Sequence, residues 1–488
     1  MVRAMRIVFP YDGYEHLGIG YLAAVAMRHE HSVELIPLNV GDYIRGHKQL
    51  SERRLRQAVL RILSAKPDVA AFSLNSFMAD DYCKVASALR RHGVKTIAGG
   101  PHATAEPVLT IQTESFDGLV THESESVFVE AVEYITHHGG APPRWLYTTD
   151  HLDACSPPAE NLDSLPLPSK ELFYRNSPFE ADDYKIVTSR GCPFRCIFCA
   201  HETTPEGPLF RRREVGGVID ELSRAAKRFH PSTIYFLDDI FTIQKEWLNE
   251  FLRAYRNSIG IPFHAISHPK YFTDEIGEML KEAGCFKIRL GVQSLTPRLK
   301  QYLGRPEENE HIALALATGR RHGIRVEVDH MVNLPGETVE EAREGLLFYN
   351  VNRPEAIKVY WLVPLPGTGW FTRAQNEGFL SAAAADELRR GKGFGRHSYL
   401  FYARRDYFNR KWLGIHFLLS YLPFLPRTFV RILVRIRADR FLRIPSFFLL
   451  VGVSRLFGIL KGSDRVGETH LRRLLRHWFS EPLQKRLA

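Results

Sequence analysis

Short apolar runs alternate with amphipathic stretches along residues 5–135. The amphipathic stretches repeat apolar side chains at three- and four-residue intervals, as Leu55, Val59 and Ile62 do. This alternation favours an α/β fold built on a doubly wound, Rossmann-like parallel sheet. Ligands of such sheets bind beyond the carboxyl ends of the strands. The predicted strands are 6–9, 32–36, 69–73, 95–98 and 118–120.

A second alternation of strand and helix patterns covers residues 184–372. Polar residues follow several of these apolar runs, at the end of the strands where barrel-like α/β folds place their chemistry. Between the two alternating regions, residues 143–183 are rich in proline, which predicts an extended linker. The predicted strands of the second region are 186–188, 233–237, 263–266, 287–290, 325–330 and 357–362.

Charge divides the chain unevenly. Residues 371–488 contain 23 Lys and Arg but 8 Asp and Glu, which gives this region a net charge of +15. Since the whole chain has a net charge of +10, the residues before it have a net charge of −5. The basic region holds the apolar runs 413–426 and 444–454, both too short to cross a bilayer. Arg427, Arg431 and Arg435 fall on one helical stripe, as in a helix that lies in an anionic membrane surface. A basic helical subdomain packed on the core is the alternative, and no nucleic-acid motif supports RNA binding.

Six cysteines are too few and too scattered for a disulfide framework, and the first apolar run is too short for a signal peptide. We therefore expect a cytoplasmic protein, held at the inner face of the membrane if the basic region binds lipid. Cys83 and Cys285 are expected to be structural, since free cysteine is usually buried.

Three cysteines in eight residues, Cys192, Cys196 and Cys199, have the spacing Cys-x3-Cys-x2-Cys. Three thiolates this close can hold three irons of a [4Fe–4S] cluster and leave the fourth iron open to another molecule. Buried structural cysteines are one alternative, and a zinc site completed by His201 is another. Phe198, between the last two cysteines, makes the run resemble the radical S-adenosylmethionine (SAM) superfamily.

The resemblance implies that the three cysteines are the metal-binding and catalytic residues, and that SAM chelates the open iron and yields a 5′-deoxyadenosyl radical. It also implies a partial (β/α)6 barrel over residues 184–372. Further segments match the family: the Asp-Asp-x-Phe run after 233–237, and the Gly-x-Gln-Ser run after 287–290. The residues expected to contact SAM or the cluster are Phe198, Asp238, Asp239, Gln293 and Ser294. Glu337 and Thr338 are better explained as helix caps.

Residues 1–142 resemble the cobalamin-binding domain that precedes many radical SAM domains. The resemblance rests on ordered segments at residues 17–24, 67–69, 99–102 and 122–125. A nucleotide-binding fold is the alternative, but Gly18-x-Gly20 lacks a third glycine. Leu17 stands where many such domains carry the histidine below cobalt, with His16 one residue away, so we expect cobalt without a protein imidazole ligand. The residues expected near cobalamin are Leu17, Ser73, Asn75, Gly99, Gly100, His102 and Glu123.

By this resemblance the chain is expected to move a methyl group from methylcobalamin to an unactivated carbon of its substrate. The basic, apolar C-terminal region adds the expectation that this substrate is hydrophobic or lipid-linked. The expected cofactors are a [4Fe–4S] cluster, SAM and cobalamin, with flavodoxin or ferredoxin as electron donor and no nucleic-acid partner. A non-methylating radical cyclase and a non-catalytic cobalamin sensor remain open. The expected organisation is a cobalamin domain over 1–142, a linker over 143–183, a radical SAM core over 184–372 and a basic, mostly helical region over 373–488.

Overall fold

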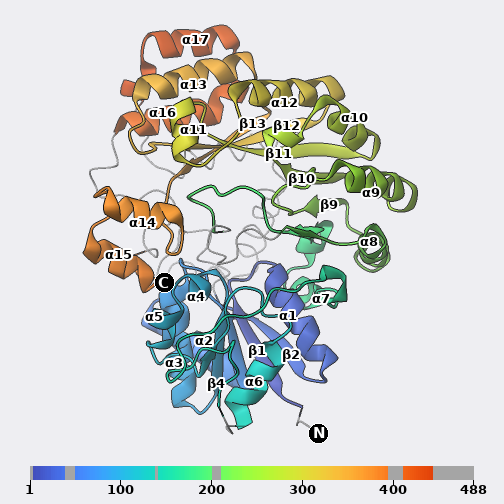
Figure 1. The fold of residues 1–488 in the computed structure, drawn as a ribbon, viewed down its shortest axis with the longest axis vertical. Helices are drawn as coiled ribbons and strands as arrows, with labels where there is room; N and C mark the ends of the chain where they lie inside the picture. The colour runs from blue at the N-terminus through green and yellow to red at the C-terminus, as the bar shows by residue number, and fades with distance from the viewer. Residues whose placement is uncertain (1–3, 39–49, 138–140, 201–209, 394–409, 443–488) are drawn as a thin grey trace, which may run out of the picture. The chain divides into compact units, whose positions relative to one another are not determined.

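The computed structural model describes residues 4–38, 50–137, 141–200, 210–393 and 410–442 (Figure 1). The chain groups into two compact units, each described by itself below. The first unit comprises Met1–Glu180, Ile197–Arg211 and Pro364–Ser398, and the second comprises Ala181–Cys196, Arg212–Val363 and Tyr399–Ala488.

The first unit is built on a five-stranded parallel sheet of order β2-β1-β3-β4-β5. Helix α1 packs with α6 and α2 packs with α3, so the sheet is covered on both faces (Figure 1). This confirms the predicted doubly wound fold, and the predicted strand ends differ by at most two residues. The strands are β1 (Arg6–Tyr11), β2 (Ser32–Pro37), β3 (Val69–Ser73), β4 (Lys95–Gly99) and β5 (Gly118–Leu119). The helices are α1 (Leu17–Arg28), α2 (Glu52–Ser64), α3 (Ala79–Arg91), α4 (Pro101–Ala105), α5 (Pro107–Ile111) and α6 (Phe128–His137).

The proline-rich segment after α6 does not form the extended linker that its composition predicts. It carries a short helix, α7 (Glu171–Asn176), whose Phe173 is buried edge-on against Tyr11 with 5.4 Å between ring centroids. Lys170, also buried, pairs with Glu15 at 3.0 Å. Apolar side chains of this segment, such as Phe173, pack against the first sheet. The free energy gained by burying them outweighs the preference of the prolines for an extended connection.

The second unit is built on a six-stranded parallel sheet of order β13-β12-β11-β10-β9-β6. All six predicted strands are present, but β6 lies earlier than the predicted 186–188 because Thr188 turns out of the ladder. Cys285 begins β11 and is buried there, as expected for a structural cysteine. The strands are β6 (Asp183–Ile186), β9 (Thr233–Phe236), β10 (Phe263–Ser267), β11 (Cys285–Gln293), β12 (Arg325–Val332) and β13 (Ala356–Trp361). Two short strands, β7 (Ser189–Arg190) and β8 (Arg211–Arg212), lie outside both large sheets.

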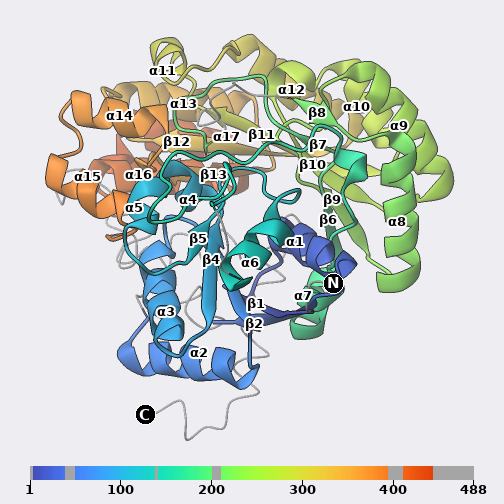
Figure 2. The same ribbon diagram turned by 60° about the horizontal axis from the view of Figure 1, so that its bottom comes forward.

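Helices cover one face of this second sheet (Figure 2). That face is apolar: Ile288 and Leu290 of β11 and Val326 and Val328 of β12 are buried on it. The helices are α8 (Val215–Phe229), α9 (Lys245–Ser258), α10 (Asp274–Glu282), α11 (Pro297–Tyr302), α12 (Asn309–His322) and α13 (Val339–Val351). Helices α14 (Gly369–Asn376) and α15 (Ala382–Arg389) belong to the first unit.

The C-terminal region is helical where it is described, with α16 (Arg410–Tyr421) and α17 (Arg427–Arg435). Helix α16 packs on β13 and α13, and α17 packs on α13. The Arg343 guanidinium on α13 donates to both carboxylate oxygens of Asp439, at 3.0 and 2.7 Å. The predicted apolar run 444–454 lies outside the described residues. Nowhere in the described ranges is there a helix both long and apolar enough to cross a membrane.

Candidate functional site

The three-cysteine loop follows β6 and is fastened to the end of the neighbouring strand β9. Asp238, only 1% exposed, accepts hydrogen bonds from the Thr188 amide at 3.1 Å, the Thr188 hydroxyl at 2.7 Å and the Ser189 hydroxyl at 2.5 Å. Burial raises the pKa of Asp238, and these hydrogen bonds oppose the shift. Asp238, predicted to contact SAM, therefore uses its carboxylate to fix the start of the cysteine loop.

Cys196 is buried beside a cation that the sequence did not single out. The Arg305 guanidinium donates to the Cys196 sulfur at 3.8 Å and also to the Gly291 carbonyl. Arg305 pairs with Glu307 at 2.8 Å, and Glu307 in turn contacts His268 at 3.1 Å. Burial raises the pKa of the Cys196 thiol, and the Arg305 guanidinium opposes that shift and so favours the thiolate form that iron requires. No sequence signal marks Arg305, because it lies in a connection more than 100 residues from the cysteine.

Cys192 and Cys199 are half-buried, as is Phe198. Burial raises the pKa of the Cys192 thiol to about 11, and the nearby Asp239 carboxylate pushes it the same way. Across the described ranges, no three His, Cys, Asp or Glu side chains are already gathered as ligands of one metal ion. The donor set fits an iron–sulfur cluster in its chemistry, and cluster binding would displace thiol protons and draw the thiolates together.

Gln293 and Ser294 lie where β11 ends. Gln293 has a positive φ of 63°, and its buried side-chain Oε1 has no hydrogen-bond partner in the described part of the chain. A buried amide oxygen without a partner is costly, so this atom points to a missing ligand and fits the predicted SAM contact. Ser294 instead accepts a hydrogen bond from the Thr296 amide at 3.2 Å.

Thr338 caps α13 in a capping box with Glu341, as predicted. Burial raises the pKa of Glu337 to about 8, and its carboxylate accepts from the Leu334 amide. His330 is packed on the helix-covered side, where its Nδ1 contacts the Tyr349 hydroxyl at 3.1 Å. None of these three side chains therefore needs a ligand to explain its position.

In the first unit, the loops after β3 and β4 are joined by main-chain hydrogen bonds. The Leu74 amide donates to the Gly99 carbonyl at 2.7 Å, and the His102 amide donates to the Leu74 carbonyl at 2.9 Å. Gly100 has a φ of 93°, and a Cβ there would lie 2.8 Å from the Leu74 nitrogen. The glycine is thus required by the approach of the two loops, whatever they bind. Ser73 is half-buried beside this junction.

Two predicted cobalamin contacts have structural partners of their own. The Asn75 side chain accepts from the Phe77 and Met78 amides, both at 3.1 Å, and so forms a turn before α3. His102 is buried, its Nδ1 lies 3.0 Å from the Ser76 hydroxyl, and burial lowers its pKa to about 4. The lowered pKa follows from this burial, so the His102 imidazole is neutral at pH 7.

Glu123 pairs with Arg211, and its carboxylate also accepts from the Ala159 amide at 3.1 Å. Leu17 is the first residue of α1, and His16 is the N-cap, whose side chain accepts from the Ile19 amide at 3.3 Å. A cavity of about 30 Å³ lies at the carboxyl end of the first sheet, lined in part by Ser73, Gly99 and Gly100. Of the predicted cobalamin residues, these three therefore share one cavity.

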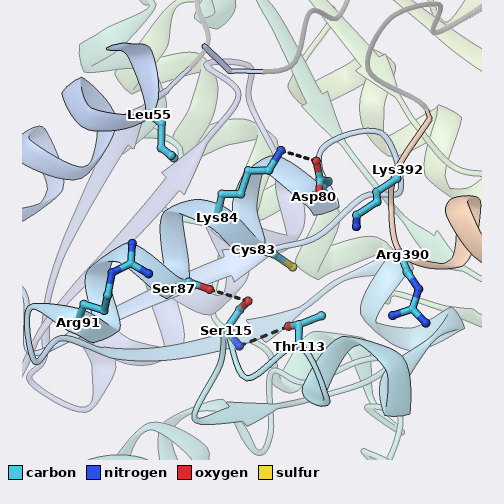
Figure 3. A pocket seen from close by; sticks show the side chains of 10 residues that line it. All are labelled: Leu55, Asp80, Cys83, Lys84, Ser87, Arg91, Thr113, Ser115, Arg390 and Lys392. Carbon is cyan, nitrogen blue, oxygen red and sulfur yellow. Dashed lines mark hydrogen bonds and ion pairs between the residues drawn. The ribbon is translucent and has the colours of Figure 1, made fainter. Parts of the chain in front are cut away.

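A larger pocket of about 350 Å³ lies between α3 and the segments that carry Thr113, Ser115, Arg390 and Lys392 (Figure 3). None of the predicted cofactor residues lines it. Cys83, predicted to be structural, faces this pocket, and burial raises its thiol pKa to about 11. A thiol with that pKa is protonated at neutral pH, so it is a poor nucleophile.

Comparison with known proteins assigns both units. Residues 186–348 match the radical SAM superfamily, and residues 2–132 match the B12 binding domain. The chain is a radical SAM enzyme with a B12-binding domain. Its cofactors are a [4Fe–4S] cluster, SAM and cobalamin.

Relatives and solved structures agree with this assignment. An uncharacterised methyltransferase of Pyrococcus horikoshii is 28% identical over 368 residues, covering 72% of this chain and 76% of its own. The hopanoid C-3 methylase of Methylococcus capsulatus is 24% identical, covering 74% of this chain and 69% of its own. The radical SAM methyltransferase TsrM from Kitasatospora setae, solved with cobalamin and a [4Fe–4S] cluster bound, has a TM-score of 0.61 at 16% identity, covering 78% of this chain and 76% of its own. At that identity, the TsrM likeness shows the fold alone.

Proposed function

We propose that this enzyme transfers a methyl group from methylcobalamin to an unactivated carbon of a hydrophobic or lipid-linked substrate. The observation that carries the proposal is the anchored three-cysteine loop after β6 in a chain that also has a B12-binding domain. When bound, the cofactors would supply a deoxyadenosyl radical that takes a substrate hydrogen atom, a methyl group on cobalt, and a second SAM that restores that methyl group.

The chain's own residues would hold and orient these groups. Cys192, Cys196 and Cys199 would ligate three irons, and Asp238 would keep the loop in register with β9. Arg305 would balance thiolate charge at Cys196. A low-potential donor such as flavodoxin or ferredoxin would reduce the cluster.

The methyl-transfer part of the proposal is supported by the relatives, since both the Pyrococcus and the Methylococcus proteins are named for methyl transfer. The lipid part is supported by the hopanoid methylase and by the surface of α17. Phe429, Ile432 and Ile436 are 45%, 54% and 58% exposed there, and Arg427, Arg431 and Arg435 are exposed on the same helix. We name the first three residues the apolar stripe of α17.

Such a stripe with flanking arginines is the surface that an anionic membrane attracts. The proposed location is therefore the cytoplasmic face of the membrane. The inner part of the C-terminal region is packed instead, since α16 buries Trp412, Ile415 and Leu419. Within the described part of the C-terminal region, α16 supports the packed-subdomain alternative, and the membrane proposal is supported by α17.

Anaerobic reconstitution followed by product analysis tests the reaction type. Methyl transfer by this route produces 5′-deoxyadenosine and S-adenosylhomocysteine in equal amounts, because one SAM is cleaved and another donates its methyl group. Deoxyadenosine without S-adenosylhomocysteine would mean cyclase-like chemistry. Neither product would mean a cobalamin sensor or carrier.

A further inference from the structure

The face of the second sheet opposite the helices carries ionisable side chains on most of its strands. Alternate residues of a strand point to the same face, and the register of the sheet aligns them across strands. Arg289 lies opposite Glu327, and Asp329 lies opposite Lys358. We call this surface the ionic face. Its members are Asp183, Lys185, Tyr235, His264, Lys287, Arg289, Glu327, Asp329, Lys358 and Tyr360.

Part of the ionic face is buried: Glu327, Lys287 and His264. Glu327 is 1% exposed and pairs with Lys287 at 3.6 Å and with Lys358 at 3.1 Å. His264 is buried, contacts Asp183 at 3.0 Å and stacks on Tyr235 with 4.0 Å between ring centroids. These buried groups therefore have ionic or hydrogen-bonding partners within the ionic face.

Three other residues of the ionic face, Arg289, Asp329 and Lys358, are partly exposed to solvent, and we call them the upper layer. The Arg289 side chain is 25% exposed, Asp329 16% and Lys358 29%. The Arg289 Nε donates to Asp329 at 2.8 Å, and its Nη2 donates to the Tyr360 hydroxyl at 2.6 Å. Burial raises the pKa of Asp329 while Arg289 opposes that shift. Arg289 pairs with Asp329, and Lys287 and Lys358 share Glu327, so these three cations and two carboxylates carry a net charge of +1.

Stability does not explain this arrangement. The strands of an all-parallel sheet are ordinarily covered on both faces and apolar on both. A buried ion pair is often no more stabilising than apolar residues of the same volume, because each charge must be removed from water. Four cationic side chains and three carboxylates on one sheet face are therefore better explained by a ligand that needs them.

Arg289 lies four residues before Gln293, which ends β11 and carries the unpartnered amide oxygen. Four residues of a strand span about 13 Å. A molecule held by the upper layer would thus extend along β11 toward the predicted SAM contact.

We infer that the ionic face binds an anionic oxyacid group, a carboxylate or a phosphate ester, at the head of the substrate, through Arg289 and Lys358. This inference rests on the proposed function and names the head group of its substrate. Arg289 uses Nε and one Nη2 hydrogen on Asp329 and Tyr360, so its remaining guanidinium hydrogens would donate to such a group. Lys358, which pairs with Glu327, would add a second positive charge. An apolar tail is then recognised elsewhere, so that the substrate is an amphiphile with an acidic head.

Saturation-transfer NMR on the reconstituted holoenzyme tests the inference with four small probes: butyl phosphate, butyrate, 1-butanol and butyltrimethylammonium. Butyl phosphate or butyrate should bind at least about tenfold more tightly than butanol, which is the effect of one charge-assisted contact. Preference for the phosphate or for the butyrate tells the two head groups apart. Equal binding of all four probes, or preference for the cation, would overturn the inference.

Variants locate the binding. Lys358→Gln leaves Glu327 with Lys287 as partner and should weaken the anionic probe about tenfold, as should Arg289→Gln. The control is Arg298→Gln on α11, where an exposed arginine pairs with Glu341 and the probe affinity should not change. If the Arg289→Gln variant does not fold, the probe affinity of the Lys358→Gln variant alone tests the site. An anion that binds both ionic-face variants as tightly as the wild type would show adventitious binding and reject the site. Deoxyadenosine formation, measured on the same samples, reports separately on the proposed radical chemistry.

Discussion

At the scale of single residues, the proposed chemistry depends on Cys192, Cys196 and Cys199, three thiols within eight residues. Their spacing indicates an iron–sulfur cluster. It did not reveal Arg305 beside Cys196, or that Asp238 anchors Thr188 and Ser189. Those contacts join positions about 50 and 109 residues apart, so a local sequence pattern cannot predict them.

Replacing Cys192, Cys196 or Cys199 with alanine should each abolish deoxyadenosine formation, because each change removes one iron ligand. The measurement is chromatographic detection of deoxyadenosine after anaerobic reconstitution with dithionite. Cys155→Ala is the matched control, an exposed cysteine outside the run that should leave the yield unchanged. Normal yield in any of the three variants would rule out the cluster assignment.

Bound cobalamin should lack a protein imidazole below cobalt, since Leu17 occupies the usual position and His16 is committed to capping α1. The Co(II) EPR spectrum should show no splitting from an axial protein nitrogen. Nitrogen splitting that disappears in His16→Ala would show that His16 is the ligand and that the motif is misaligned.

Gly100→Ala should destabilise the first unit more than Gly93→Ala. Both glycines have positive φ, but a Cβ at Gly100 meets the Leu74 main chain at 2.8 Å, whereas a Cβ at Gly93 meets nothing within 4 Å. Gly93→Ala isolates the cost of the conformation, about 1 kcal/mol. The clash at Gly100 should raise the loss to roughly 2–4 kcal/mol. Urea denaturation measures both, and equal losses would contradict the close approach of the two loops.

At the scale of elements, strand and helix patterns were largely predictable, because each has a clear period and the strands are buried. The predicted strand 186–188 was misplaced, since hydrogen bonds to Asp238 draw Thr188 out of the ladder. The proline-rich segment was predicted to be open and is packed through Phe173 and Lys170. The proline content indicates that the segment is locally stiff, but it does not indicate which surface the segment packs against.

Helix α17 should bind anionic vesicles through its apolar stripe and arginines. Each Lys or Arg near such a surface contributes about 1 kcal/mol at low salt. Replacing Phe429, Ile432 and Ile436 together with serine should abolish flotation with phosphatidylserine-containing liposomes. Leu314→Ser on α12, another exposed apolar position, is the control and should float normally. A serine variant that still floats, or a wild type that ignores anionic vesicles at low salt, would refute membrane docking by α17.

At the scale of the whole molecule, the order of two α/β regions was predictable from the alternation, and their cofactors followed from the resemblance. The ionic face was not predicted. Its members alternate with apolar residues along each strand, and they gather only when the register of six strands is known. A substrate site of this kind belongs to the assembled sheet rather than to any segment.

Transfer of a deuterated methyl group tests the central claim most directly. The reconstituted holoenzyme is supplied with SAM that carries three deuterium atoms on its methyl group, with methylcobalamin generated from that SAM, and with an extract of acidic membrane lipids. The account predicts a product that gains one methyl group bearing all three deuterium atoms, formed together with deoxyadenosine and S-adenosylhomocysteine. Deoxyadenosine formed with no labelled methyl group in any product would contradict methyl transfer.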